Sequence, residues 1–318
     1  EHHGIPITRS EGRTMTAVTG ASLGLGLDAG GTKTRWALSR PDGGLVAEGF
    51  VAGLTALQVN TGDGRAHIKH TMTDLAAQVA AYGGAKRVCA GVTGLDSRDE
   101  QLCSAIAGPL GISGEDVTVH SDIEIAYRDL FPPGEGYVIY AGTGSIAAYI
   151  DPAGTLHRAG GRGVYLDDAG GGFWIVREAL RHIWRLEDEQ PGRWQQSPMA
   201  VAIFERIGGS DWSFTRQFFY TSDRGEIGQL ATAVAATVDG DPFARTIIEQ
   251  AGVELARLGN AMIRRFGLRP LALAGGAARM HPLIESTLRK QLTHGAELTV
   301  RIAEAHLAAA RIAARLLS

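Results

Sequence analysis

The chain has 318 residues, of which 44% are hydrophobic and 20% are charged. These shares are those of an ordinary globular protein, so a disordered or fibrous chain is excluded, and the length predicts about two domains. The 31 Lys and Arg nearly balance the 34 Asp and Glu, which argues against the broad basic surface that nucleic-acid binding requires. With only two cysteines, Cys89 and Cys103, a disulfide framework and a four-thiolate zinc site are excluded.

The N-terminal segment differs in character from the rest of the chain. Residues 1–20 begin with Glu1-His2-His3 and stay polar up to Met15, so we interpret them as a tag remnant or a disordered leader. The sequence has neither a basic-then-apolar secretory signal nor an apolar run of 18 residues, so export and a membrane span are not expected. Together with the low cysteine content, these features favour the cytoplasm.

Strand and helix patterns alternate in the first half of the chain. A β-meander is expected at the start, because apolar runs flank the turn Pro41-Asp42-Gly43-Gly44. A helical period of apolar residues then extends from Ile68 to Val79. The expected strands are 23–27, 35–39, 45–51, 87–92 and 117–120, and the expected helices are 64–82, 98–110 and 123–131.

The second half repeats the opening strand–turn–strand–turn–strand pattern. Its turn Asp151-Pro152-Ala153-Gly154 has the place that Pro41–Gly44 has in the first half. This internal symmetry predicts two similar α/β domains with a cleft between them. The expected strands are 137–140, 146–150, 155–159, 271–274 and 298–301, and the expected helices are 173–187, 196–208, 225–238, 241–266, 281–292 and 303–317.

Three glycine-rich loops follow expected strands. The chain holds 43 glycines, about twice the usual ~7% share, and glycine lets backbone N–H groups approach an anion without a Cβ in the way. The loops are Asp28–Thr34, Ala141–Ser145 and Ala274–Ala278. Each alone is also what a hairpin turn or a tight strand–helix joint requires, whereas all three in this order favour nucleotide binding.

Side chains of the first loop add specific chemistry. Thr32 and Thr34 supply hydroxyl donors, and Lys33 supplies a positive charge. Asp28, at the end of a strand, could hold Mg²⁺ through water. The ten histidines show no metal-ligand spacing, so no other metal site is expected.

These motifs resemble the sugar kinase/actin/Hsp70 ATPase superfamily, and within it the N-acetylglucosamine kinases grouped with the BadF/BadG/BcrA/BcrD-type ATPases. The resemblance extends from about residue 23 to residue 317. The motifs that carry it are Asp28–Thr34, Ser121-Asp122 before a helix, Gly142–Ser145, Gly160-Gly161-Arg162-Gly163 with Asp168 and Gly170 shortly after, and Ala274–Ala277. It implies an α/β fold of two ribonuclease-H-like domains that flank a nucleotide cleft. One domain would hold 21–121 plus 303–318, and the other 122–302.

The resemblance also implies Mg-ATP in the cleft and a sugar hydroxyl that attacks the γ-phosphate. The acceptor is expected to be an amino sugar, N-acetylglucosamine in the first place, and the protein a homodimer that binds neither nucleic acid nor membrane. The implied nucleotide-binding residues are Gly30, Gly31, Thr32, Lys33, Thr34, Gly142, Thr143, Gly144, Ser145, Gly275, Gly276 and Ala277. The implied sugar-binding residues are Asp122, Thr143, Arg162 and Asp168.

Asp122 is the residue that the resemblance makes the catalytic base. A carboxylate at this place can accept the proton of the sugar hydroxyl as attack proceeds. From the local sequence alone, an N-cap of the following helix is the simpler interpretation. The phosphate loops on either side of Asp122 in the sequence favour the base.

The expected sugar side departs from the family pattern. Asp167-Asp168-Ala169-Gly170-Gly171 stands where the family has Gly-Asp-Glu-Gly-Ser, and Gly53-Leu54-Thr55-Ala56 where it has Gly-Pro-Ser-Asn. Arg162 replaces an aromatic residue, and we expect it to form a salt bridge with Asp167 or Asp168. The alternative is that Arg162 binds an anionic group of the substrate, such as that of a muramic acid. The reaction class is therefore better supported than the particular sugar.

Two other functions stay open. Activators of 2-hydroxyacyl-CoA dehydratases are ATPases of the same broad family that share an iron–sulfur cluster across a dimer, and two cysteines would meet that need. Neither cysteine lies in the expected Cys-Ala-Ala-Gly-type loop, and Cys89 lies in an apolar strand. A non-catalytic nucleotide sensor is the other alternative, against which the presence of Asp122 argues.

Overall fold

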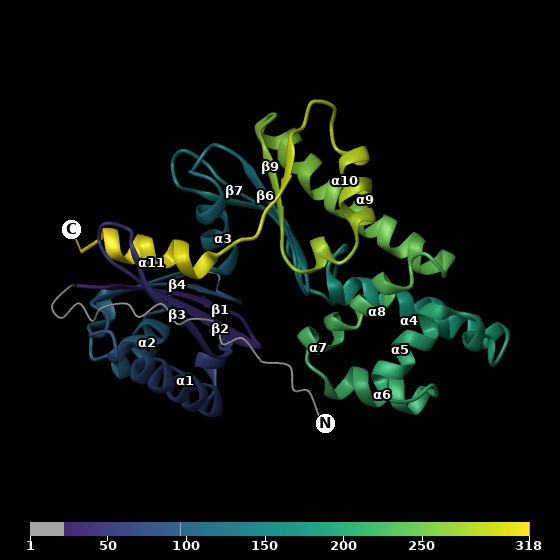
Figure 1. The fold of residues 1–318 in the computed structure, drawn as a ribbon, viewed down its shortest axis with the longest axis horizontal. Coiled ribbons are helices and arrows are strands. Elements are labelled where there is room, and N and C mark those ends of the chain that lie inside the picture. The colour runs from purple at the N-terminus through teal and green to yellow at the C-terminus, as the bar shows by residue number, and fades with distance from the viewer. Residues whose placement is uncertain (1–21, 96, 318) are drawn as a thin grey trace, which may run out of the picture.

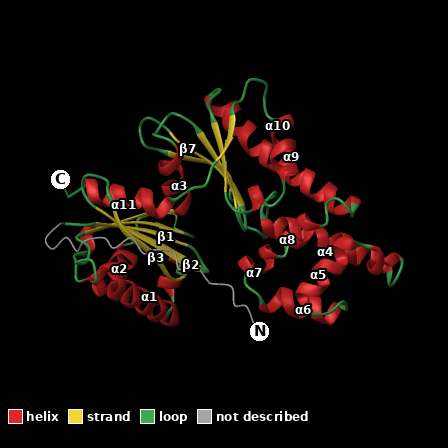
Figure 2. Ribbon diagram, viewed as in Figure 1, coloured by secondary structure: helices red, strands yellow, loops and turns green. Residues whose placement is uncertain are grey.

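Two five-stranded sheets with helices packed on them form the protein (Figures 1 and 2). The computed structural model describes residues 22–95 and 97–317, and the leader expected at 1–20 lies outside them. Helices and strands alternate along the chain, so the α/β class expected from the sequence is confirmed. None of the described helices is long and apolar enough to cross a membrane.

The first sheet has the strand order β3-β2-β1-β4-β5. Its strands are β1 (Gly24–Ala29), β2 (Lys33–Ser39), β3 (Leu45–Ala52), β4 (Arg87–Val92) and β5 (Val117–Ser121). Strands β1, β2 and β3 pair antiparallel, whereas β4 joins β1 and β5 joins β4 in parallel. The expected meander is therefore confirmed, and the parallel strands are those reached through helical connections.

The glycines of β1 explain how helices cover this sheet. Leu25 and Leu27 join the apolar core on one face, while Gly24 and Gly26 alternate with them and face the C-terminal helix. A Cβ on Gly26 would stand 2.1 Å from the backbone nitrogen of Ala310, so only glycine permits this close approach. The helices of this half are η1 (Ala56–Asn60), α1 (Gly62–Ala80), α2 (Glu100–Leu110), η2 (Gly114–Asp116), α3 (Asp122–Leu130) and α11 (Ala305–Arg315).

The second sheet has the order β10-β9-β6-β7-β8. Its strands are β6 (Tyr137–Ala141), β7 (Ser145–Ile150), β8 (Leu156–Gly160), β9 (Leu271–Ala274) and β10 (Leu298–Val300). Strands β6, β7 and β8 pair antiparallel, and β9 and β10 add in parallel. The two sheets thus share one topology, as the repeated sequence pattern predicts.

The helices of the second half form a larger group than the sequence predicts. Helix α6 was not expected, and the single helix expected at 225–238 is two helices that meet at Leu230. The helices are α4 (Gly172–Glu189), η3 (Arg193–Gln196), α5 (Pro198–Ile207), α6 (Trp212–Thr221), α7 (Arg224–Gln229), α8 (Ala231–Ala236), α9 (Pro242–Phe266), η4 (Ala277–Arg279) and α10 (Pro282–Gln291).

Helices α3 and α11 join the two halves. Helix α3 follows β5 and contacts β4 of the first sheet as well as β6 and β7 of the second. Helix α11 follows β10 but returns to the first sheet, where it lies against β1 and β4 (Figure 1). The chain therefore passes twice between the halves, and the domain boundaries near 121/122 and 302/303 stay predictions.

Candidate functional site

The first glycine loop joins β1 to β2 and is open. The N–H of Gly30 donates to the carbonyl of Lys33 at 3.1 Å, which closes the turn. Gly31, Thr32 and Lys33 are exposed, and a Cβ on Gly31 would meet only the methyl of Thr55, at 3.8 Å. The loop therefore leaves room for a ligand to reach its backbone.

Two side chains of this loop, Thr34 and Lys33, are placed within the protein rather than in that space. Thr34 is buried, and its hydroxyl has no hydrogen-bond partner among the described residues. The Lys33 ammonium lies 3.9 Å from the centroid of the Phe50 ring, a cation–π contact. Thr34 is thus buried within the protein, and a nucleotide contact by its hydroxyl stays a prediction.

The second glycine loop joins β6 to β7 and is held far more tightly. The carbonyl of Gly142 accepts the N–H of Gly172 at 2.8 Å, and the carbonyl of Thr143 accepts that of Phe173 at 3.0 Å. The Ser145 hydroxyl donates to the carbonyl of Ala169 at 2.7 Å. The segment that leads into α4 therefore supports this loop from behind.

Asp168 belongs to the same structure as the second loop. Its backbone has φ 50°, the left-handed region that a non-glycine residue rarely adopts. One carboxylate oxygen accepts the N–H of Gly163 at 3.0 Å, and a Cβ on Gly144 would stand 2.2 Å from the other. Burial raises the pKa of Asp168, against the hydrogen bonds from Gly163 and Arg162. A strained, buried carboxylate beside a glycine loop is typical of a binding site.

The third loop follows β9 and touches the second. Gly275 has φ +101°, and a Cβ there would stand 2.2 Å from the carbonyl oxygen of Ala141, the last residue of β6. Gly276 has open space around its Cα, whereas Ala277 is buried. The two loops of the second sheet therefore lie side by side, with Gly276 as the exposed position.

Helix α7 brings the loops of the two sheets into one neighbourhood. A Cβ on Gly225 would stand 3.3 Å from the hydroxyl of Thr32 in the first loop. One turn later, a Cβ on Gly228 would stand 3.5 Å from the methyl of Thr143 in the second loop. The first and second loops are thus both within reach of one short helix.

Asp122 stands at the junction, where β5 ends and α3 begins. Its Oδ1 accepts the N–H of Ile123 at 2.8 Å, and its Oδ2 accepts the hydroxyl of Thr93 at 2.7 Å. The N-cap of α3 is Ser121, so Asp122 is the first residue of the helix. Gly91 of β4 lets α3 pack closely here, because a Cβ on it would stand 3.1 Å from the Ile125 side chain. The cap that the local sequence indicated is therefore one residue earlier.

Asp28, the expected magnesium residue, lies near Asp122. Burial raises the pKa of Asp28, and the negative charge of Asp122 raises it further, while His306 and Arg35 act in the opposite direction. Arg35 is the cross-strand partner of Asp28 in β2. Two carboxylates that interact in this way are a suitable environment for a divalent cation.

Sequence reasoning missed three residues of this site: Thr93, Tyr140 and Arg279. Burial raises the pKa of Tyr140, and the negative charges of Asp28 and Asp122 raise it further. Ile139 faces α9, and Tyr140 on the opposite face therefore points toward α3. Arg279 follows the third loop and donates to the carbonyl of Gly275 at 3.5 Å.

Arg162 lies in the exposed turn before Asp168, and the salt bridge expected for it is wrong for Asp167. Asp167 pairs instead with Arg257, at 3.3 Å. The backbone N–H of Arg162 donates to the Asp168 carboxylate, and Arg162 itself is exposed. Among the described residues, the Arg162 side chain therefore forms neither of the two salt bridges that the sequence suggested.

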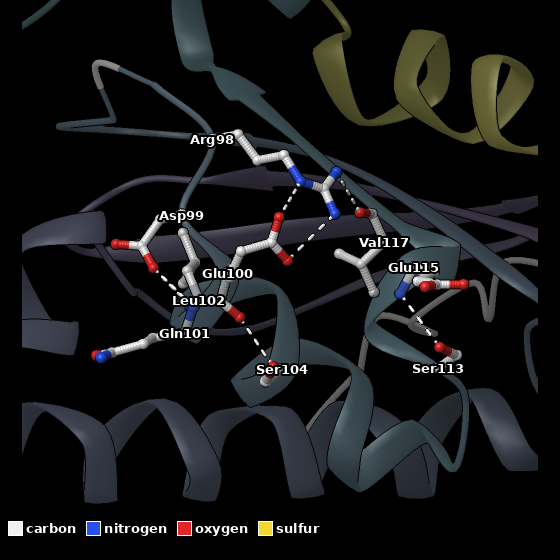
Figure 3. A network of polar contacts seen from close by, with 9 residues as sticks. All are labelled: Arg98, Asp99, Glu100, Gln101, Leu102, Ser104, Ser113, Glu115 and Val117. Atoms are coloured by element: carbon white, nitrogen blue, oxygen red, sulfur yellow. Dashed lines mark hydrogen bonds and ion pairs between the residues drawn. The ribbon is translucent and has the colours of Figure 1, made fainter.

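A cavity of about 430 Å³ adjoins the junction. Its lining includes Arg98, His120 and Glu124 from the first half and Leu156 from β8. The Arg98 guanidinium donates to Glu100 at 2.6 Å and to the carbonyl of Val117 at 3.4 Å, and both contacts are drawn in Figure 3. His120 and Glu124 form an ion pair at 3.0 Å. Because these charges already have partners, we assign no ligand to the cavity.

The two cysteines are both free and buried, on different sides of the first sheet. Cys89 packs with Ala309 of α11, whereas Cys103 of α2 joins the core with Leu102. Burial raises the pKa of Cys89 to about 12. Thiols so placed cannot converge on one iron–sulfur cluster at a dimer interface, which argues against the activator hypothesis.

Two sheets of one topology, each contributing a glycine hairpin at the junction spanned by α3, define the actin-like ATPase fold. Comparison with known families agrees. The model of the BadF/BadG/BcrA/BcrD ATPase family matches residues 25–305. The chain belongs to this family, which implies that it uses ATP.

Curated relatives are sugar kinases at low identity. An N-acetyl-D-glucosamine kinase of Dictyostelium discoideum is 25% identical over 240 residues, which cover 71% of this chain and 72% of the relative. An N-acetylmuramic acid/N-acetylglucosamine kinase of Clostridium acetobutylicum is 25% identical over 281 residues, which cover 84% and 89%. This chain is therefore similar to amino-sugar kinases over most of its length.

Solved structures support the fold. A structure from Chromobacterium violaceum whose description proposes an N-acetylglucosamine kinase has a TM-score of 0.71 at 22% identity, covering 92% of this chain and 99% of that one. A ROK family glucokinase from Streptomyces griseus, in complex with glucose and AMPPNP, has a TM-score of 0.58 at 18% identity, covering 93% and 100%. At these identities the likeness shows the architecture alone.

Proposed function

We propose that the protein is an ATP-dependent sugar kinase that transfers the γ-phosphate to a hydroxyl of an amino sugar. The observation that carries the proposal is Asp122, a carboxylate at the junction of the two halves with Thr93 bound to it at 2.7 Å. The first and second glycine loops both lie close to α7, at Thr32 and at Thr143, which supports a shared site for the phosphates. Family membership supports ATP as the donor, and the names of the relatives support the amino sugar.

Each part of the site has a role in this proposal. The backbone of the first and second loops, with Thr32 and Thr143, would bind the phosphates, and Gly276 would border the adenosine. Asp122 would accept the proton of the sugar hydroxyl as its oxygen attacks phosphorus. Asp168, fixed by the N–H of Gly163, would accept hydrogen bonds from other sugar hydroxyls. The loops then position the reactants, on which phosphoryl transfer mainly depends.

Magnesium fits the carboxylates at the junction. Mg²⁺ is usually held by one or two carboxylates together with waters and substrate phosphates, and Asp28 beside Asp122 offers such a donor set. Among the described residues, no cluster of three or more His, Cys, Asp or Glu could hold a metal by itself. We propose that Asp28 would hold Mg²⁺ through water and that the cation would neutralise charge on the phosphates.

N-acetylglucosamine is the first acceptor that we propose, and Arg162 makes an anionic amino sugar the second. Because Arg162 is exposed and Asp167 pairs elsewhere, its guanidinium is available to a carboxylate such as the lactyl group of N-acetylmuramic acid. A homodimer stays a prediction, which the mass in solution tests.

A coupled assay of ADP release across sugars tests the proposed function. N-acetylglucosamine or N-acetylmuramic acid should stimulate ATP turnover more than glucose. If Arg162 binds an anion, Arg162→Ala should remove any preference for N-acetylmuramic acid and leave N-acetylglucosamine turnover within about twofold. Sugar-independent ATP turnover with every sugar offered would contradict the proposal and favour a sensor or activator.

A further inference from the structure

The Asp122 carboxylate has both oxygens held from the protein side. Its Oδ1 accepts the N–H of the next residue, Ile123, and its Oδ2 accepts the hydroxyl of Thr93 at 2.7 Å. We propose that Thr93 is the positioning residue of the kinase, whose hydroxyl orients the Asp122 carboxylate toward the acceptor hydroxyl. This inference rests on the function proposed above, in which Asp122 is the base.

The backbone of Thr93 is fixed on both sides, so its hydroxyl can serve as a rigid reference. Its N–H donates to the carbonyl of Ala29 at 3.0 Å, and its carbonyl accepts the N–H of Ala56 at 3.0 Å. Ala29 ends β1, directly before the first glycine loop, and Ala56 opens η1. One residue therefore connects the base with the strand that leads into a phosphate loop and with the segment 53–56.

The internal symmetry of the fold gives a second, independent observation. Thr93 comes directly after β4, and the strand with the same place in the second sheet is β9, which Gly275 follows. Thr93 binds the carbonyl of Ala29 at the end of β1, and Gly275 lies against the carbonyl of Ala141 at the end of β6. Thr93 and Gly275 therefore have equivalent positions in the two halves. Gly275 begins the third loop, whereas Thr93 carries the hydroxyl that donates to Asp122.

The chemistry of the contact suits a positioning role. A hydroxyl that donates to a carboxylate forms a charge-assisted hydrogen bond, which is stronger than one between neutral groups. Each carboxylate oxygen has two lone pairs, so Oδ2 can accept from Thr93 and still accept a proton from a substrate. Loss of the hydroxyl leaves one oxygen of Asp122 unheld, and a small misplacement of a reacting group lowers the rate steeply.

The variants Thr93→Val and Thr93→Ser test the hydroxyl itself, because Val keeps the shape and Ser keeps the donor. With the sugar that the parent protein phosphorylates, Thr93→Val should lower kcat by about 10- to 100-fold and change the KM for ATP by less than about twofold. Thr93→Ser should retain roughly half or more of the parental kcat. Thr118→Val, on the neighbouring strand β5, is the matched control and should leave kcat unchanged.

A double-mutant cycle then shows whether Thr93 acts through Asp122. In the Asp122→Asn background, Thr93→Val should cause no further loss of kcat, because the base that it positions is absent. Parental kcat in Thr93→Val, no rescue by Ser, or additive losses in the double variant would overturn the inference. Should Thr93→Val fail to fold, Thr93→Ala in both backgrounds gives the same comparison. A parent protein that phosphorylates no sugar overturns the proposed function and this inference with it, whereas an active parent with an active Val variant overturns the inference alone.

Discussion

The two hairpin loops have the same place in the two sheets but differ in how they are held. In the second loop, the carbonyls of Gly142 and Thr143 and the hydroxyl of Ser145 are all bound by the segment that leads into α4. In the first loop, the backbone of Gly53 packs against the carbonyl of Gly31, but a Cβ on Gly31 would meet only the methyl of Thr55, at 3.8 Å, and Thr32 and Lys33 are exposed. The second half therefore provides a preformed support, and the first provides an open edge that a ligand can reach.

Substitution of one glycine beside the second loop and of one in the first loop should show the largest difference in stability. A Cβ on Gly171 would stand 2.6 Å from the carbonyl carbon of Gly144. Relief of this clash would require the two backbone segments to move apart. We expect Gly171→Ala to lower the free energy of unfolding by ~3 kcal/mol, and Gly31→Ala to change it by less than about 0.5 kcal/mol. Urea unfolding measures both values, and equal losses would contradict the comparison.

The third loop allows a similar test of ligand access without a change in stability. Gly276 has ordinary helical dihedral angles and nothing within 4 Å of a built Cβ, so Gly276→Val should fold normally. Its side chain should enter the space proposed for adenosine and raise the Kd for ATP by about tenfold or more. Gly62, at the start of α1, has equally open surroundings, and Gly62→Val is the control. Unchanged ATP affinity in Gly276→Val, measured by calorimetry, would remove the third loop from the nucleotide site.

Asp28, which lies just before the first loop, should lower the stability of the folded protein by a smaller amount that depends on pH. Burial and the charge of Asp122 raise the pKa of Asp28 above its usual value of 3.8, so the folded state holds this proton to higher pH than the unfolded state. Stability contributed by Asp28 is thus lost as pH rises through that window and stays lost at neutral pH. We expect Asp28→Asn, without magnesium, to have a higher Tm than the parent at pH 7 and a smaller gain near pH 4.

The control for this prediction is Asp42→Asn, an exposed carboxylate in the turn between β2 and β3. Its Tm should follow that of the parent protein at every pH, because an exposed charge contributes little. Scanning calorimetry from pH 4 to 7 measures the difference. A lower Tm for Asp28→Asn at neutral pH would show that the Asp28 carboxylate is stabilising and would remove the cost assigned to it.

The sequence predicts most of the sheets because their strands are short segments rich in apolar residues, bounded by turn residues such as Pro41–Gly44 and Asp151–Gly154. Strands β4 and β9 were predicted with their observed ends, Arg87–Val92 and Leu271–Ala274. Helix α6 was missed because Trp212–Thr221 is rich in aromatic residues, which fit a strand as well as a helix, and Thr215 is its one fully buried residue. The split at Leu230 was missed for a similar reason, since a run of Ala and Val supports one helix as well as two.

The candidate site is harder to predict because its contacts join distant parts of the chain. Thr93 lies 29 residues from Asp122, and only the register of the parallel strands β4 and β5 brings the two together. The pairing of Asp167 with Arg257 spans 90 residues, so local sequence gave Arg162 a partner that the fold assigns elsewhere. Loop motifs, in contrast, are local, and the family they indicated is confirmed by the match over residues 25–305.

The turnover of Asp122→Asn with the accepted sugar tests the central claim most directly. Asn keeps the size of Asp and an oxygen that can accept the N–H of Ile123, and the Thr93 hydroxyl can turn to accept from its amide. The fold and the Kd for ATP should therefore stay near those of the parent protein, while kcat falls by ~10²–10⁴-fold because the proton acceptor is gone. An Asn variant that folds, binds ATP and turns over the sugar at the parental rate would contradict the account and leave Asp122 outside the reaction.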